Sequence, residues 1–310
     1  MDGESSNMDP RERAKHGPLD KPVFVRGSDL EGGSLFASHR GGGRMSRHFG
    51  FFDRDGGVAW LCGMTEYTQE RLNPRHRHTF DQVRYYLKGG EKMGREVFRP
   101  GDVVYFPESS PYGPTSTADG YDENVRVTMQ FEGPSRIKYH HIDDINQAQE
   151  DIKNHGHFDT GAFRWDDGHN QDSYEAVITH LTGEKPVYPE PRYGTFTTMH
   201  SNAYPWCPYG DGVEGVWVRH LAYFNEVGPN IKMLKIDPGG ATPAAEAVCE
   251  QVRLLIDGEA MYEGEDYGAV SGLYLPPKVP FGSIASKTGA TFLVVQRAAQ
   301  GGPPPEYTLA

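Results

Sequence analysis

Two histidines separated by one residue are the part of this chain whose spacing points most directly to chemistry. His76 and His78 stand in the segment NPRHRHTFDQVRYYLKG, residues 73–89. On a β-strand, side chains two positions apart point the same way, so both imidazoles can face one point. Imidazole is the commonest side-chain ligand of transition metals. We therefore expect His76 and His78 to bind a metal; the alternative is a pair of strand histidines hydrogen-bonded to backbone or solvent.

Three further side chains can contribute to the same site. Gln82 follows the histidines after a short bend. It offers an amide oxygen as a ligand, or it makes a hydrogen bond inside the fold. Arg84 faces the same way as Gln82 and can hold a carboxylate or phenolate in bidentate fashion, with a structural ion pair as its alternative. Tyr112, in YFPESSPYGP at 105–114, is expected to line the pocket, because a phenol ionises only near pKa ~10.

An internal repeat shows that the chain contains the same module twice. DQVRYYLKG at 81–89 recurs as EQVRLLIDG at 250–258, and YFPESSPYGP at 105–114 recurs as YLPPKVPFGS at 274–283. Both pairs are 169 positions apart, so the two copies share one architecture. The second copy keeps Arg253 at the place of Arg84. At the places of the two histidines, the glutamine and the tyrosine it has Ala245, Ala247, Gln251 and Phe281. A metal is therefore expected only in the first copy.

Composition favours an all-β fold. The 310 residues include 38 Gly and 23 Pro, and short aromatic or β-branched runs such as VRYYL and VRLLI lie between these turn residues. This pattern is typical of antiparallel strands, and such modules close as jelly-roll barrels. The net charge of −12 disfavours nucleic acid as a partner. No apolar run approaches the ~18 residues of a membrane span, so we expect no membrane contact and a cytoplasmic protein.

The repeat also suggests the domain organisation. We expect two short helices in the connector, in IDDINQAQEDIKNHG at 142–156 and in SYEAVITHLTG at 173–183, followed by a Pro- and Tyr-rich loop. Histidines 140, 141, 155 and 157 of this connector are expected at the surface, although one of them could complete the metal site. The predicted parts are an N-terminal arm with entry strands at 1–43, the first barrel at 44–135, the connector at 136–213, the second barrel at 214–298 and a tail at 299–310.

The chain resembles the two-domain proteins of the cupin superfamily. Their first motif, Gly, His-x-His, Glu and Gly, is matched by His76, His78 and Gly89, with Gln82 at the Glu position and Glu70 at the first Gly. In their second motif Gly101 and Pro107 match. Ser109, Tyr112 and Ser116 stand where the family has Gly, His and Asn. The resemblance implies two jelly-roll, or double-stranded β-helix, barrels and one divalent transition metal in the first.

The resemblance also implies an activity. We expect a metal-dependent enzyme, a dioxygenase acting on a small anionic or phenolic organic acid in the first barrel, because HRHTFDQVRYYLKG resembles a stretch of ring-cleaving gentisate-type bicupins. His76, His78 and Gln82 would hold the metal, with Arg84 and Tyr112 as catalytic residues. Fe(II) is favoured, with Mn, Ni and Zn open. The alternatives are a lyase or isomerase that uses the metal as a Lewis acid, and a non-catalytic ligand-binding bicupin. A homodimer is expected by analogy.

Overall fold

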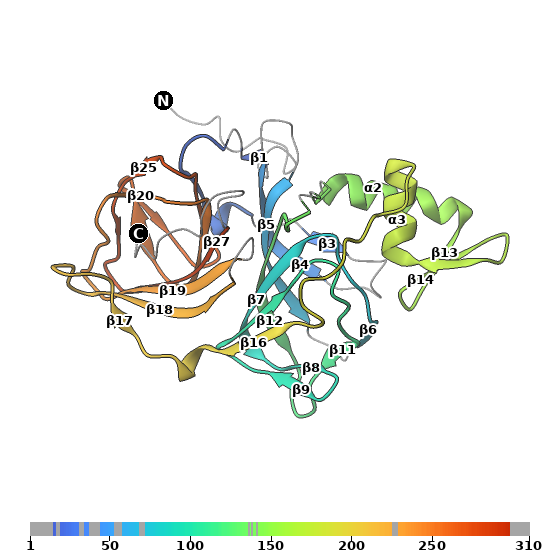
Figure 1. The fold of residues 1–310 in the computed structure, drawn as a ribbon, viewed down its shortest axis with the longest axis horizontal. Coiled ribbons are helices and arrows are strands. Elements are labelled where there is room, and N and C mark those ends of the chain that lie inside the picture. The colour runs from blue at the N-terminus through green and yellow to red at the C-terminus, as the bar shows by residue number, and fades with distance from the viewer. Residues whose placement is uncertain are drawn as a thin grey trace. The chain divides into compact units, whose positions relative to one another are not determined.

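The computed structural model describes residues 15–16, 19–30, 34–36, 44–52, 58–67, 72–135, 137, 139–140, 142–224 and 229–297. These residues form two compact units, coloured mainly cyan to yellow-green and orange to red in Figure 1. Unit 1 holds most described residues up to Thr198, and unit 2 holds those from Met199 onward together with the segment around 19–30. The predicted tail at 299–310 lies outside the described residues, and the predicted domain boundaries stay predictions.

Unit 1 is built on two antiparallel sheets that form barrel 1. The long sheet has the order β1-β4-β5-β12-β7-β10-β16, with β3 beside β4. Its strands are β1 (Lys15–His16), β3 (Ser34–Phe36), β4 (Arg44–Phe52), β5 (Val58–Tyr67), β7 (Asp81–Gly89), β10 (Asp102–Phe106), β12 (Asn124–Phe131) and β16 (Thr197–His200). The short sheet has the order β6-β11-β8-β9, comprising β6 (Leu72–Asn73), β8 (Glu91–Met93), β9 (Glu96–Phe98) and β11 (Thr115–Thr117).

Two helices and a small sheet follow barrel 1 in the chain. They are α2 (Ile142–Ile152), the 3-10 turn η3 (Lys153–His155), the strands β13 (Gly156–Asp159), β14 (Ala162–Trp165) and β15 (Asn170–Asp172), and α3 (Ser173–Thr182). Both expected helices are present, and they pack on each other through Ile145, Ala148 and Val177 (Figure 1). Asp172 caps α3 by accepting hydrogen bonds from the backbone N–H groups of Tyr174 and Glu175, and Gly183 ends it in the left-handed conformation. None of the described helices is long and apolar enough to span a membrane.

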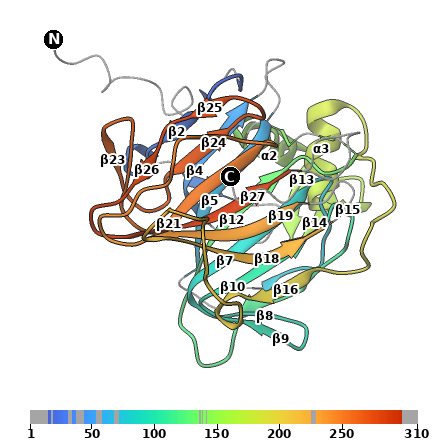
Figure 2. The same cartoon turned by 60° about the vertical axis from the view of Figure 1, so that its left-hand side comes forward.

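Unit 2 contains barrel 2, whose long sheet has the order β17-β18-β19-β27-β21-β24-β2 (Figure 2). Its strands are β17 (Cys207–Pro208), β18 (Val216–Tyr223), β19 (Asn230–Ile236), β21 (Gln251–Gly258), β24 (Gly272–Leu275), β27 (Ala290–Gln296) and β2 (Val23–Val25). The shorter strands are β20 (Ala245–Glu246), β22 (Ala260–Tyr262), β23 (Glu265–Tyr267), β25 (Pro280–Phe281) and β26 (Ile284–Ala285). The 3-10 turns η1 (Gly27–Leu30) and η4 (Ser201–Ala203) complete the unit.

The structure confirms the predicted all-β fold of two jelly-roll barrels with a partly helical connector. Equivalent strands occupy equivalent places: β7 lies between β12 and β10, and β21 lies between β27 and β24. One feature was not anticipated from the repeat. β2, from the segment 1–43 expected to hold an arm and entry strands, pairs with β24 of barrel 2. An edge strand that gains a partner no longer exposes unpaired backbone groups.

Candidate functional site

Strand β7 supplies two of the candidate site residues to the interior of barrel 1. Gln82 lies opposite Phe106, and Arg84 lies opposite Val104, on the neighbouring strand β10. Phe106 and Val104 belong to the buried core of the barrel. Because residues directly opposite on paired strands project from the same face, Gln82 and Arg84 also point inward. Both side chains are almost completely buried.

A backbone bridge brings His76 beside Tyr112, which is 36 residues further along the chain. The N–H of each residue donates to the carbonyl of the other, at 3.0 and 2.9 Å. The two side chains therefore project together, with ring centroids 4.4 Å apart. His78 lies close by, its ring centroid 4.9 Å from that of His76. The three rings thus form one aromatic group, in which His76 and Tyr112 are buried and His78 is half-buried.

The Tyr112 hydroxyl lies at the point on which these side chains converge. Its oxygen is 2.9 Å from His76 Nε2 and 3.1 Å from Arg84 Nη2. It is 3.4 Å from both His78 Nε2 and Gln82 Nε2. Four nitrogen atoms from different parts of the barrel therefore surround one phenolic oxygen. The structure brings all five predicted site residues together, and their roles as ligands or catalytic groups stay predictions.

The hydrogen bonds of His76 define its tautomer. Its Nδ1 is 2.7 Å from the carbonyl oxygen of Pro74, which can only accept, so Nδ1 carries the proton. The neutral ring then presents the lone pair of Nε2 to Tyr112, and the phenol donates to it. A carbonyl that holds the outer nitrogen is also the arrangement that orients metal-ligating histidines. His76 is thus set to use Nε2 inside the barrel.

Arg84 belongs to a buried network of charged side chains. Arg84 Nη1 lies 3.3 Å from Glu91 Oε2, and Arg126 and Tyr86 also donate to this carboxylate. Burial alone would raise the pKa of Glu91, but Arg126 and Arg84 outweigh it and hold the pKa below its usual range. Burial, followed by the Glu91 charge, raises the pKa of Tyr86 well above its ordinary value. Two guanidinium groups against one carboxylate leave a net positive charge, which favours an anionic ligand near Arg84.

Gln82 is already engaged by neighbours. Gln130 Nε2 donates to its amide oxygen at 2.9 Å. With the amide turned over, its oxygen would instead accept from Arg84 Nε and Nη2, at 2.9 and 3.1 Å. In either orientation the oxygen has a donor from the barrel wall. This geometry favours a supporting role for Gln82 beside Tyr112 and Arg84.

The distances between the candidate ligand atoms can be compared with those found around a divalent metal. Neighbouring ligand atoms on an ion with bonds of about 2.1 Å lie roughly 3.0 Å apart in octahedral and 3.4 Å apart in tetrahedral geometry. The distances from Tyr112 Oη to His76 Nε2 and His78 Nε2, 2.9 and 3.4 Å, match these values. Within the part of the chain that is described, no three His, Cys, Asp or Glu side chains form a metal cluster. With Tyr112 as a ligand, the two histidines and the phenol offer three donors at these spacings.

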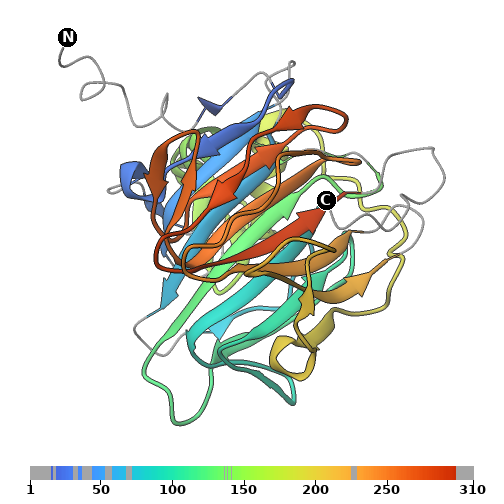
Figure 3. The same cartoon turned by 90° about the vertical axis from the view of Figure 1, so that its left-hand side faces the viewer.

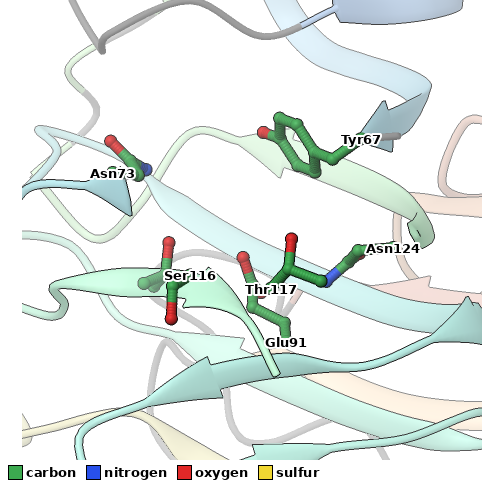
Figure 4. Close-up of a pocket in the computed structure, with 7 residues that line it drawn as sticks. Tyr67, Asn73, Glu91, Ser116, Thr117 and Asn124 are labelled. Atoms are coloured by element: carbon green, nitrogen blue, oxygen red, sulfur yellow. The ribbon is translucent and has the colours of Figure 1, made fainter. Parts of the chain in front are cut away.

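A second polar space in barrel 1 lies beside Glu91 (Figure 4). Its lining includes Asn73 and Asn124, whose side-chain oxygen atoms are buried without a hydrogen-bond partner among the described residues. The space has room for about one water molecule. It is therefore too small for an organic substrate, and an ordered water there would satisfy the two amides. The remaining lining residues are Tyr67, Thr115, Ser116 and Thr117.

Sequence reasoning missed Glu91 and Arg126, the two residues that complete the charge network of Arg84. A signal was present in the repeat, because Ala260 stands at the place of Glu91 in the second copy. A carboxylate present in one barrel and absent from the other is informative when an arginine is kept in both. Of the connector histidines, 155 and 157 are at or near the surface, and 141 lies outside the described residues.

Comparison with known proteins supports the fold. No family model matches the sequence, and no curated protein matches it. A solved structure of a provisionally assigned dioxygenase from Nostoc punctiforme is 13% identical, with a TM-score of 0.60, covering 89% of this chain and 83% of that one. A provisionally assigned glyoxylate-induced protein from Pseudomonas aeruginosa is 11% identical, with a TM-score of 0.55 and 90% of each chain covered.

Oxalate decarboxylase from Bacillus subtilis, whose structure was studied for its Mn(II) centres, is a further neighbour. It is 13% identical, with a TM-score of 0.55, covering 92% of this chain and 79% of that one. At such identities the likeness concerns the fold and not the activity. These neighbours share the two-barrel architecture seen here. The chain therefore has the fold of the two-domain cupins, as its sequence motifs suggested.

Proposed function

We propose that barrel 1 is the active site of a metal-dependent enzyme that acts on a small anionic or phenolic organic acid. The observation that carries this proposal is the convergence of His76 Nε2, His78 Nε2 and Arg84 Nη2 on the Tyr112 hydroxyl, within 2.9–3.4 Å. Barrel 2 has the same scaffold but Ala245 and Ala247 at the places of the histidines. A purely structural role would give no reason for one barrel to gather these groups.

In this proposal His76, His78 and Tyr112 hold one divalent transition metal. The Pro74 carbonyl keeps the proton of His76 on Nδ1, so that Nε2 is free to donate its lone pair. Tyr112 would bind as phenolate, which requires release of the phenol proton now donated to His76. Bound Fe(II) would supply redox chemistry toward O₂, and Mn, Ni or Zn would supply Lewis acidity.

Arg84 would position the substrate. Its guanidinium is fixed by Glu91 at 3.3 Å and lies over the Phe106 ring, 4.4 Å from the ring centroid. A fixed guanidinium is well suited to a carboxylate or phenolate, because its planar N–H groups match two acceptors at once. The aromatic rings of Phe106 and Tyr112 would exclude water around an aromatic or alkyl part of the acid. We favour a dioxygenase with Fe(II), and the lyase or isomerase reaction is the alternative for a redox-inert metal.

One observation favours a metal-free binding protein as the second candidate. His76 Nε2 and Arg84 Nη2 lie 2.9 and 3.1 Å from the Tyr112 oxygen, so the hydroxyl is hydrogen-bonded without an ion. The Arg84 charge then attracts an anion directly, with no ion between them. The two candidates differ in metal content, and that difference can be measured.

The test is metal analysis of protein purified without chelators, combined with an O₂-uptake screen over hydroxybenzoates and small aliphatic acids. We expect one ion per chain, lost in the His76→Ala/His78→Ala double variant. Changing the connector residues His155 and His157 to Ala serves as the matched control and should leave the ion in place. Metal with O₂ uptake supports the dioxygenase, and metal with turnover but no O₂ uptake supports the lyase or isomerase. Wild-type protein that binds an acid without any metal would overturn the proposal.

A further inference from the structure

Barrel 2 contains a row of inward-facing residues across the three neighbouring strands β19, β27 and β21. These strands belong to the orange and red part of the ribbon in Figure 3. Lys232 lies opposite Val294, and Val294 lies opposite Arg253. Val294 belongs to the core cluster of this barrel, and Arg253 lies over the core residue Phe281 at 4.8 Å. Since opposite residues share a face, Lys232 and Arg253 both project into the barrel from either side of Val294.

The two cations are buried without a counter-charge. Lys232 is 3% exposed and Arg253 is 2% exposed. Neither Lys232 Nζ nor Arg253 Nη1 has a hydrogen-bond partner among the described residues. All the buried Asp and Glu side chains of the described residues belong to unit 1, and none belongs to unit 2. A buried charge is normally paired, and the described residues of unit 2 supply no buried carboxylate for this pairing.

The equivalent row in barrel 1 has a carboxylate beside its arginine. There Arg84 lies opposite Thr128, and Thr128 lies opposite Gly63. Arg84 is paired with the carboxylate of Glu91 on β8. At the same place on β22, barrel 2 has Ala260, while Arg253 remains and Lys232 replaces the glycine. Barrel 2 thus lacks the internal carboxylate and carries a second cation, Lys232, in this row.

The other titratable groups that face Lys232 do not supply a negative charge. Burial, with a smaller contribution from Arg253, lowers the pKa of Lys232 to about 8, so it is charged at neutral pH. Burial raises the pKa of the nearby Cys249 thiol to about 11, so this thiol is neutral there. His220, opposite Lys232 on β18, has its pKa lowered by burial and by Lys232, and is neutral as well. Lys232 and Arg253 are therefore left as two unneutralised positive charges.

We propose that barrel 2 binds a small organic carboxylate between Lys232 and Arg253, in the place that the Glu91 side chain occupies in barrel 1. One carboxylate oxygen would accept from Lys232 Nζ and the other from Arg253 Nη1. The surrounding Val294, Phe281 and Leu255 suit a ligand whose remainder is apolar and small. This binding site is distinct from the proposed catalytic site and stands on residues of unit 2 alone.

The experiment measures anion binding to the full-length protein by calorimetric titration and thermal shift. Acetate and oxalate are the probes, phosphate and sulfate are the comparison anions, and sodium chloride controls for ionic strength. A ligand that binds only the folded state raises its melting temperature. We expect stabilisation by the carboxylates, and an affinity reduced roughly tenfold or more in Lys232→Met and in Arg253→Met. Lys235→Met, on the same strand but with a partly exposed side chain, is the matched control and should bind normally.

The variants also separate the two barrels. Carboxylate binding that survives in His76→Ala/His78→Ala and in Arg84→Met, but not in Lys232→Met, supports the site in barrel 2. Binding that is lost with Arg84 and kept without Lys232 would move the anion to barrel 1 and overturn the proposal. Stabilisation by chloride as strong as that by acetate, or tighter binding of phosphate and sulfate than of carboxylates, would also overturn it. Arg253→Met decides the matter if Lys232→Met does not fold.

Discussion

Replacing Lys232 by Met should make the ligand-free protein more stable, although it removes a charged residue from a strand. The pKa of Lys232 is lowered from 10.5 to about 8, first by burial and then by Arg253. Each pKa unit corresponds to about 1.4 kcal/mol, so holding this charge in the folded state costs about 3 kcal/mol. Met fills a similar volume without a charge. We therefore expect the free energy of unfolding of unit 2 to rise by about 3 kcal/mol at pH 7.

The pH dependence gives the sign of this effect. Below pH 8 the lysine is protonated in both states and the full penalty applies. As the pH rises from 8 toward 10.5, the folded state releases the proton first, so the penalty fades and the wild type gains stability. The advantage of Lys232→Met should therefore shrink to about 1 kcal/mol near pH ~9.5. His220, Cys249 and Arg253 face the same region, so their contributions must be the same in both proteins.

Differential scanning calorimetry in carboxylate-free buffer is the assay. A gain of about 3 kcal/mol corresponds to a rise in melting temperature of roughly 6–12 °C for a domain of this size. Lys235→Met is the control: its side chain is 35% exposed and its ammonium pairs with Asp237 at 3.1 Å, so a change below about 1 kcal/mol is expected. A melting temperature that is unchanged or lower at pH 7 in Lys232→Met would refute the reasoning, because it would mean that Lys232 is neutralised within the protein.

Three further predictions concern barrel 1. Tyr112→Phe should remove bound metal and, in protein loaded with Fe(III), abolish a visible tyrosinate charge-transfer band; unchanged metal content by elemental analysis would show that Tyr112 only lines the pocket. Glu91→Gln should destabilise unit 1 by about 3–5 kcal/mol in denaturant unfolding, since Arg84 and Arg126 lose their buried counter-charge. The control Glu123→Gln, which breaks the exposed pair with Lys88, should cost less than about 1 kcal/mol. Burial raises the pKa of Asp81 to about 7, although Arg192 and the Glu108 N–H lower it. The free energy of unfolding of the wild type should therefore fall as the pH rises from ~4 to 7, and Asp81→Asn should flatten that decline. Equal slopes in the two proteins would contradict this assignment.

The sequence alone determined the fold and the equivalence of the barrels. A repeat at a constant spacing of 169 residues, with alternating apolar strands and Gly or Pro turns, leaves few architectures other than two copies of one β-barrel. Strand alternation also determined that Gln82 and Arg84 share a face, because on β7 the direction of a side chain follows from its position along its own strand. The same argument predicted that His76 and His78 lie on one strand. In the structure His76 lies in an isolated bridge with Tyr112 and His78 lies outside the strands, so strand alternation does not account for their meeting.

The tertiary structure decided which of these side chains meet. Tyr112 reaches the histidines through a backbone bridge between residues 36 positions apart, and Glu91 reaches Arg84 from a strand of the other sheet. In barrel 2 the register of three strands places Lys232 and Arg253 on either side of Val294. Register and sheet packing depend on hydrogen bonds between distant segments, so no local pattern in the sequence reveals them. For this reason the sequence pointed to the candidate site but not to the central place of the Tyr112 hydroxyl, nor to the unpaired cations of the second barrel.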